Sequence, residues 1–165
     1  MKVNTNMKSI LHKYLTEAIE VIPQNNAYPI WTKTDVTGRV YWGVSSFCGL
    51  DDQPILSSEA LSQLEWAGNE VYLDTQTDDD IPHILRQAIG ILAFWKHELE
   101  TKYPDMPFYL FASYDDGNAQ VLSGNESPVR SFCLRFWAHR DGSAVIDLSD
   151  FDYWAQPAII EFCNF

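Results

Sequence analysis

The sequence predicts an α+β fold, and three observations carry this prediction. Apolar residues recur at helical spacing in residues 7–22, a longer apolar helix is indicated at 80–102, and short β-branched and aromatic runs follow from 108 almost to the end. Short turns between successive strands favour antiparallel pairing, and helices gathered before strands are typical of this class. Because the 165 residues contain no internal repeat or linker, we expect a single domain spanning 1–165.

The N-terminal part is expected to form an amphipathic helix followed by a hairpin. Asn6 can cap the helix at 7–22, and Pro23 should stop it because proline has no amide hydrogen to donate. The runs 30–34 and 39–45 are rich in β-branched and aromatic residues, and they flank a glycine that tolerates positive φ. This pattern predicts a β-hairpin.

The middle of the chain predicts a short helix, a short strand and a long central helix. A serine can cap the short helix at about 57–68, and the strand is expected at 70–74. The long helix at 80–102 is apolar on nearly every side between 88 and 95. We therefore expect this helix to be covered on more than one face and to form the central pillar of the fold.

The C-terminal part is expected to form a mainly antiparallel sheet. The pair Asp141-Gly142 predicts a hairpin turn because both residues tolerate positive φ. Alternation within 129–139 places its side chains in two rows. One row is apolar and should be buried: Phe132, Leu134, Phe136 and Ala138. The other row is mixed, and it is either part of a recognition surface or covered by another element: Ser131, Cys133, Arg135, Trp137 and His139. The expected strands are 108–114, 119–122, 129–139, 143–148 and 158–163.

Charge and hydropathy exclude several classes of partner. The chain carries 23 Asp and Glu against 11 Lys and Arg, a formal net charge of -12, which repels nucleic-acid phosphates and anionic lipids. No apolar run approaches the length of about 18–20 residues that a bilayer span needs, and residues 1–6 lack a signal-peptide core. We expect no direct nucleic-acid or membrane partner and a cytoplasmic location. The sequence does not determine an oligomeric state.

The residues that carry metal or catalytic chemistry do not match the patterns that such chemistry needs. An EF-hand loop starting at Asp74 would place Leu85 where a glutamate is required, and Asp78 to Asp80 fit the start of a helix instead. His97-Glu98 begins a zinc-helix motif that fails at Thr101. We therefore expect no metal, no cofactor and no enzyme activity. The chain has an odd number of cysteines, and their spacing does not match that of metal ligands. We therefore expect reduced thiols in the core: Cys48, Cys133 and Cys163.

Acidic residues interleaved with aromatic ones recur in the turns of the predicted sheet and in its final loop. Negative charge steers a basic protein toward the surface, and aromatic side chains then supply much of the binding energy. The alternative is that the acidic residues only keep a hydrophobic chain soluble. The candidate partner-binding residues are Tyr114, Asp115, Asp116, Trp137, Asp141, Asp150, Asp152, Tyr153 and Trp154.

Three segments resemble the small acidic immunity proteins encoded beside bacterial contact-dependent or polymorphic toxins. They are FYLFASYDDG (108–117), SFCLRFWAHRDG (131–142) and IDLSDFDYW (146–154), in about the last third of the chain. The resemblance is one of general character, so it transfers no individual functional residue. It implies a non-catalytic inhibitor that binds and neutralises a cognate toxin domain in the cytoplasm, often a nuclease whose active surface is basic.

Two other functions remain open at this point. An acidic decoy that imitates a nucleic acid would need regularly spaced surface carboxylates, whereas here the carboxylates cluster at turns. An unrecognised small enzyme would need a deep pocket in which titratable groups converge.

Overall fold

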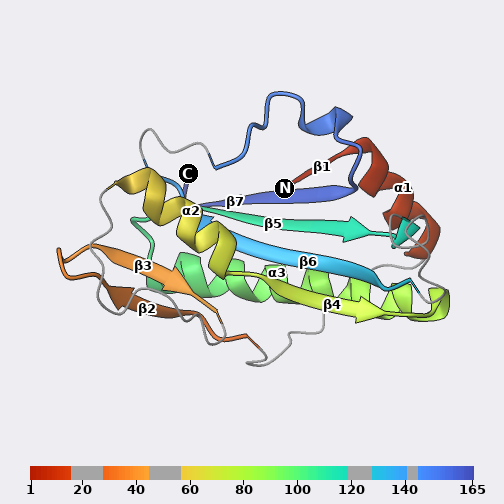
Figure 1. Ribbon diagram of the computed structural model, residues 1–165, viewed down its shortest axis with the longest axis horizontal. Helices are drawn as coiled ribbons and strands as arrows, with labels where there is room; N and C mark the ends of the chain where they lie inside the picture. The colour runs from red at the N-terminus through yellow and green to blue at the C-terminus, as the bar shows by residue number, and fades with distance from the viewer. Residues whose placement is uncertain (16–27, 45–56, 119–127, 141–144) are drawn as a thin grey trace.

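The computed structural model describes residues 1–15, 28–44, 57–118, 128–140 and 145–165. Seven strands and three α-helices are seen in these residues, together with two short 3-10 turns (Figure 1). In chain order the elements are β1 (Lys2–Val3), α1 (Thr5–Tyr14), β2 (Trp31–Thr34), β3 (Val40–Gly43), α2 (Ser58–Gly68), β4 (Val71–Thr75), η1 (Asp78–Asp80), α3 (Ile81–Lys102), β5 (Phe108–Asp115), β6 (Arg130–Ala138), η2 (Phe151–Tyr153) and β7 (Ala158–Cys163).

The main sheet has five antiparallel strands in the order β1-β7-β5-β6-β4, and β2 and β3 form a separate hairpin. In the register, Ala112 of β5 lies opposite Leu134 of β6 on one side and Ile159 of β7 on the other. Helix α3 runs across one face of the sheet, while α2 lies on the opposite face (Figure 1). The predicted α+β class, the long central helix and the antiparallel sheet are confirmed.

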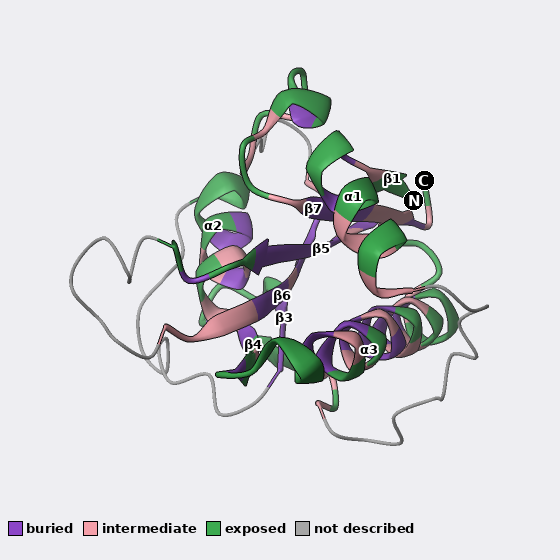
Figure 2. Ribbon diagram, turned by 90° about the vertical axis from the view of Figure 1, so that its right-hand side faces the viewer, coloured by how far each residue is buried: buried purple, intermediate pink, exposed green. Residues whose placement is uncertain are grey.

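The face of the sheet toward α3 forms the larger hydrophobic core. The predicted apolar row of β6 is fully buried there, and Ala88, Leu92 and Trp95 of α3 pack against it. Ala93, however, is exposed and Ile89 is only half-buried, so the described residues leave the outward side of α3 uncovered at these two positions. Figure 2 shows the buried stripe of α3 turned toward the sheet and its exposed stripe turned outward. Besides the sheet, the segment before β2 contacts this helix, because Trp95 Nε1 donates to the carbonyl of Tyr28 at 3.0 Å.

The opposite face carries a smaller aromatic core. Phe111, Trp137 and Ile160 are buried there beneath Trp66 of α2 and Phe151 of η2. Residues 145–148 cross this core without forming a strand, so the strand expected at 143–148 is wrong for these described residues. Their apolar side chains pack onto the aromatic core instead of extending the sheet. The strand expected at 119–122, the turn at 141–142 and Cys48 lie outside the described residues.

Helix α1 begins earlier than expected because a different asparagine caps it. Asn4, not Asn6, is the N-cap, since its Oδ1 accepts from the amide of Met7 at 2.9 Å. The same Oδ1 accepts from the amide of Ala158 at 3.0 Å, so the cap also attaches α1 to β7. The Asn6 side chain donates to the carbonyls of residues 154 and 155 instead. The described helix ends at Tyr14, and the remainder of the expected range lies outside the described residues.

A buried polar junction joins α2 to β3 and to the C-terminal end of β6. The Glu65 carboxylate, 2% exposed, accepts from the amides of Trp42 at 3.1 Å and Ala138 at 2.8 Å. Arg140 binds the same carboxylate through both of its terminal nitrogens, at 2.9 and 2.6 Å. Burial raises the pKa of the Glu65 carboxyl, whereas the guanidinium and the two amides act in the opposite direction.

Asn69 completes this junction one helical turn after Glu65. Its Oδ1 accepts from the amide of Val44, and its Nδ2 donates to the carbonyls of Trp42 and Phe136, each at 3.0 Å. Strand β4 pairs with β6 only up to Leu134, so side chains of α2 satisfy the backbone of β6 beyond that point. The helix thus replaces a missing stretch of strand between β3 and β6.

Candidate partner-binding surface

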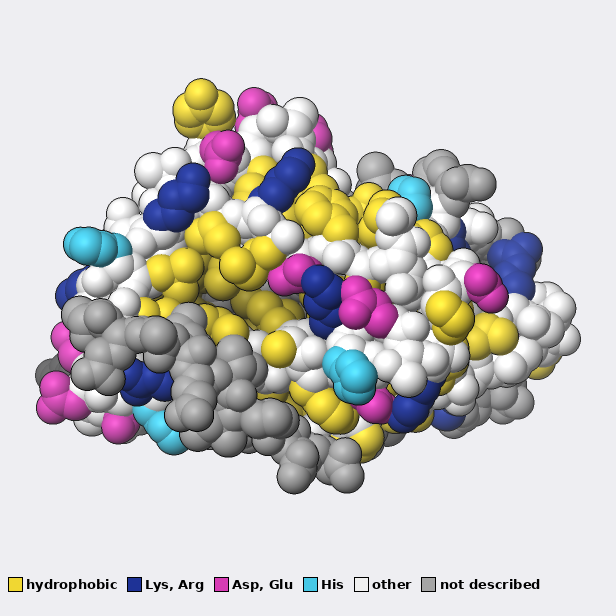
Figure 3. Space-filling model, turned by 180° about the vertical axis from the view of Figure 1, so that it is seen from behind, with side chains coloured by type: hydrophobic (Ala, Val, Ile, Leu, Met, Phe, Trp, Pro, Cys, Tyr) yellow, Lys and Arg dark blue, Asp and Glu magenta, His cyan; other side chains and the backbone are white. Residues whose placement is uncertain are grey.

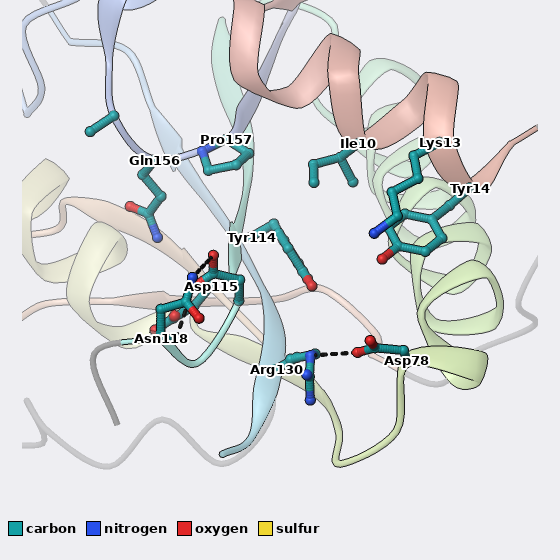
Figure 4. A pocket seen from close by; sticks show the side chains of 12 residues that line it. Ile10, Lys13, Tyr14, Asp78, Tyr114, Asp115, Asn118, Arg130, Gln156 and Pro157 are labelled. Carbon is teal, nitrogen blue, oxygen red and sulfur yellow. Dashed lines mark hydrogen bonds and ion pairs between the residues drawn. The ribbon is translucent and has the colours of Figure 1, made fainter. Parts of the chain in front are cut away.

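A hollow of about 490 Å³ lies where the C-terminal end of β5 meets α1 (Figure 4). Tyr14 of α1, Tyr114 of β5 and Arg130 of β6 contribute to its lining. The Arg130 Nε donates to Asp78 Oδ1 at 2.8 Å, and Lys13 lies over the Tyr14 ring at 4.6 Å from its centroid. This hollow therefore combines phenol groups with charges of both signs.

Tyr114 is part of both the core and the hollow. Its side chain is 4% exposed, and its ring packs on Phe132 with the centroids 4.8 Å apart. Burial raises the pKa of the Tyr114 phenol to about 12, so the hydroxyl stays protonated at neutral pH. Tyr114 was predicted to bind a partner, but only the hydroxyl end of its ring is accessible to one.

The turn after β5 holds the predicted Asp115 and Asp116 in exposed positions. Asp115 Oδ1 accepts from the amide of Gly117, and Asp116 Oδ1 accepts from the amide of Asn118, both at 2.9 Å. Gly117 has φ +75°, and a Cβ there would lie 2.8 Å from the carbonyl oxygen of Val129, so the turn requires glycine. Within the described part of the chain, neither carboxylate contacts a cationic side chain.

A second hollow of about 290 Å³ lies on the α2 face of the sheet. Its apolar walls include Trp66, Phe111 and Trp154, and Ser113 and Ser131 contribute polar groups. Both hollows share two lining residues, Asp115 and Gln156, so they adjoin at the end of β5, and we refer to the two hollows together as the concave surface.

Arg135 lies in the second hollow but its charge is already engaged. Its guanidinium forms an ion pair with Glu70 and lies over the Trp66 ring, 4.4 Å from the centroid. Its Nε also donates to Cys133 Sγ at 3.3 Å. Burial lowers the pKa of the Arg135 guanidinium and raises the pKa of the Cys133 thiol. Arg135 therefore fixes one wall of the hollow and is not a free cation.

The prediction that Trp137 belongs to a binding surface is wrong. The Trp137 side chain is 2% exposed, stacks on Tyr109 with the centroids 5.1 Å apart and meets Trp66 edge-on at 4.9 Å. Alternation identified its face of the strand correctly, but α2 covers that face at this position. Asp141 lies outside the described residues.

The remaining predicted residues lie on the segment around η2. Asp150, Asp152 and Tyr153 are exposed, Tyr153 to 87%, whereas Trp154 is half-buried against Phe111 and Phe151. Only Trp154 of these four lines the concave surface around Asp115. Asp152 and Tyr153 instead line another hollow, which also contains Lys2 and Lys8. The predicted acidic residues therefore lie in two separate regions, one at the end of β5 and the other around η2.

The side of the molecule that carries α3 does not present a single sign of charge. Figure 3 shows basic and acidic side chains close together there, beside a hollowed area of hydrophobic side chains. Lys96 of α3, for example, forms ion pairs with Glu161 at 2.8 Å and with Glu100 at 3.9 Å. This mixture of charges does not favour a basic partner over an acidic one.

Sequence reasoning missed several residues of the second hollow, among them Ser113 and Trp66. Ser113 interrupts the apolar run of β5 and shares a strand face with Asp115, which was the available signal. Trp66 belongs to the helix expected at about 57–68, and no pattern within that helix distinguishes it as a binding residue. Its position between Arg135 and Trp137 depends on how α2 crosses the sheet, and no local pattern encodes that crossing.

Comparison with known proteins identifies no relative: no family model, no curated protein and no solved structure matches this chain. No group of three or more His, Cys, Asp or Glu in the described residues is arranged to hold a metal ion. Among the described helices, none combines the length and apolar character that crossing a membrane requires.

Proposed function

We propose that this protein binds a basic partner protein and neutralises it, and that the partner is a cognate bacterial toxin domain acting in the cytoplasm. The observation that carries the proposal is the pair Asp115 and Asp116, two exposed carboxylates without a cationic partner in the described chain, beside a concave surface with aromatic walls. The resemblance of the C-terminal segments to immunity proteins supports the toxin as partner class. A nuclease with a basic active surface fits this charge.

In this proposal, charge raises the rate of association and aromatic contact supplies much of the affinity. A net charge of -12 raises the rate of encounter with a basic protein, and complementary fields accelerate association by about 10–10³-fold at low salt. The half-buried Trp154 and the exposed Tyr153 offer apolar area, which contributes more to affinity than rim charges do.

The hollows support this proposal better than an enzymatic one. The thiol in the second hollow, Cys133, has its pKa raised by burial, and a nucleophilic cysteine needs the opposite shift. The acidic-decoy alternative is also less well supported, because Asp115-Asp116 and Asp150-Asp152 occupy two separate turns and do not form a regular array.

The proposal is tested by co-expressing this protein with the product of the gene beside its own. We expect that product to be toxic alone, harmless in the presence of this protein and bound to it in purified form. The association rate should fall as ionic strength rises, because salt screens the attraction. If the neighbouring product is harmless alone, or stays toxic and unbound, the proposal is wrong.

A further inference from the structure

The second hollow is lined by a serine whose side chain is almost entirely buried but whose hydroxyl is open to the hollow. Ser113 is 5% exposed, lines this hollow from β5 and makes no hydrogen bond with its side chain in the described structure. A hydroxyl that faces a lined hollow and makes no hydrogen bond within the protein is available to a ligand, and a ligand that excludes water from the hollow has to supply its partner. Ser131, directly opposite Asp115 in the sheet register, contributes a second hydroxyl to the same hollow.

The charges around these hydroxyls favour a cation. Asp74 of β4 and Asp115 of β5 both lie opposite Ser131 of β6, so a row of two carboxylates and one hydroxyl crosses three strands on one face. Neither carboxylate forms an ion pair with a described residue. Among the described residues that line the hollow, Arg135 is the one cation, and its charge is neutralised by Glu70. The surplus charge at this end of the sheet is therefore negative.

The size and the lining of the hollow suit one long side chain. Its volume of about 290 Å³ is at the lower limit of small-molecule pockets, which span about 300–1,000 Å³. Phe111, Ile146 and Trp154 provide apolar walls for an aliphatic stem. The acceptors are spread over two strands, because Ser113 and Asp115 lie two residues apart on β5 and Ser131 lies opposite Asp115 on β6. This spread suits a planar fork of five donors better than a compact ammonium group.

We propose that the second hollow binds an arginine side chain presented by the partner protein, with its guanidinium between Asp115 and the hydroxyls of Ser113 and Ser131. This inference rests on the proposed function, because it names the group of the partner that the surface recognises. A buried arginine of this kind is a frequent anchor of protein interfaces.

The experiment is an NMR titration of the full chain with Nα-acetyl-arginine amide at constant ionic strength. We expect saturable shifts of the Ser113 and Asp115 amides and of the Trp154 indole N–H. The lysine analogue should bind more weakly, and the norleucine analogue, which has the stem without the charge, should produce no saturable shift. Equal binding of either analogue, or shifts confined to other regions, would overturn the inference.

Two variants and a matched control locate the bound guanidinium. Asp115→Asn should weaken binding of the arginine probe about fivefold or more, because it removes a charge-assisted hydrogen bond. Ser113→Ala should weaken it about two- to fivefold. Asp105→Asn makes the same change of charge before the other end of β5 and should leave binding as in the wild type. Unchanged binding in Asp115→Asn contradicts the inference.

The outcome for this inference is separable from the outcome for the proposed function. If the partner is neutralised in co-expression but the arginine probe does not bind in an Asp115-dependent way, the arginine inference fails and the proposed function stands. If the probe binds as expected but the neighbouring product is neither toxic nor bound, the proposed function fails instead.

Discussion

The two ends of β6 differ in whether the polar side chains near them are hydrogen-bonded within the protein. At the C-terminal end, Glu65 and Asn69 of α2 are buried, and the described hydrogen bonds join them to Arg140 and to the backbone of two strands. At the N-terminal end, about 23 Å away by strand rise, Ser131 lies beside Asp115 with no such partners. One end is a closed junction, and the other is an open surface.

This difference indicates that the polar residues at one end contribute to stability and those at the other end to binding. A buried network in which every member is paired holds elements in one arrangement, and removal of one member leaves the others unsatisfied. Polar groups without partners contribute little to the fold and are available to a ligand. We therefore expect substitutions at the closed end to change the free energy of unfolding, and substitutions at the open end to change binding.

The largest effect is expected from Glu65→Ala. This change removes the carboxylate that binds the Arg140 guanidinium and that accepts from the amides of Trp42 and Ala138. Removing one partner of a buried ion pair destabilises a protein by about 3–5 kcal/mol. Urea unfolding followed by circular dichroism measures the loss.

Glu59→Ala, an exposed position in the first turn of the same helix, is the control and should change stability by less than about 0.5 kcal/mol. A loss below about 1 kcal/mol for Glu65→Ala would show that the junction does not hold α2 in place.

The next effect concerns the buried tyrosine at the open end and depends on pH. Because the pKa of Tyr114 is about 12 in the folded protein and about 10 in the unfolded chain, the folded state keeps its proton where the unfolded state loses it. This contribution to stability is complete below pH 10 and is lost as pH rises toward 12. Its loss amounts to about 1 kcal/mol at pH 11.

Tyr114→Phe removes that titration while it keeps the ring on Phe132. Compared with the wild type, we expect the variant to lose about 1 kcal/mol less stability between pH 9 and pH 11, as measured by urea unfolding at both values. Equal losses in the two proteins would mean that the Tyr114 phenol titrates normally, and therefore that its ring is not buried.

The contrast between the two ends of β6 also shows which features local sequence patterns can predict and which they cannot. Alternation in β6 identified the buried row that includes Leu134, because period-two spacing depends on local geometry alone. The same alternation did not reveal that α2 covers Trp137 and leaves Ser131 uncovered. Which part of a sheet face is covered depends on the path of a distant helix, and that path is set by tertiary packing.

The closed junction was also beyond sequence reasoning. Ser62, Glu65 and Asn69 recur at helical spacing along α2, and such a polar stripe is normally the solvated side of a helix. Here it is buried because β3 and β6 present backbone groups that β4 does not pair. The predicted carboxylates at Asp115 and Asp116 were easier to place, since a turn with glycine after a strand exposes its polar residues.

The smallest effect on stability, and the sharpest test of the comparison, is expected from Asp115→Asn. Asparagine keeps the side-chain oxygen that accepts from the Gly117 amide, so the turn is preserved. The removed charge has no cationic partner in the described chain and lies on the same face of the sheet as Asp74. We therefore expect unfolding free energies within about 0.5 kcal/mol of the wild type in low salt. A loss above about 1 kcal/mol would show that Asp115 stabilises the fold, and the distinction between a closed and an open end of β6 would fail.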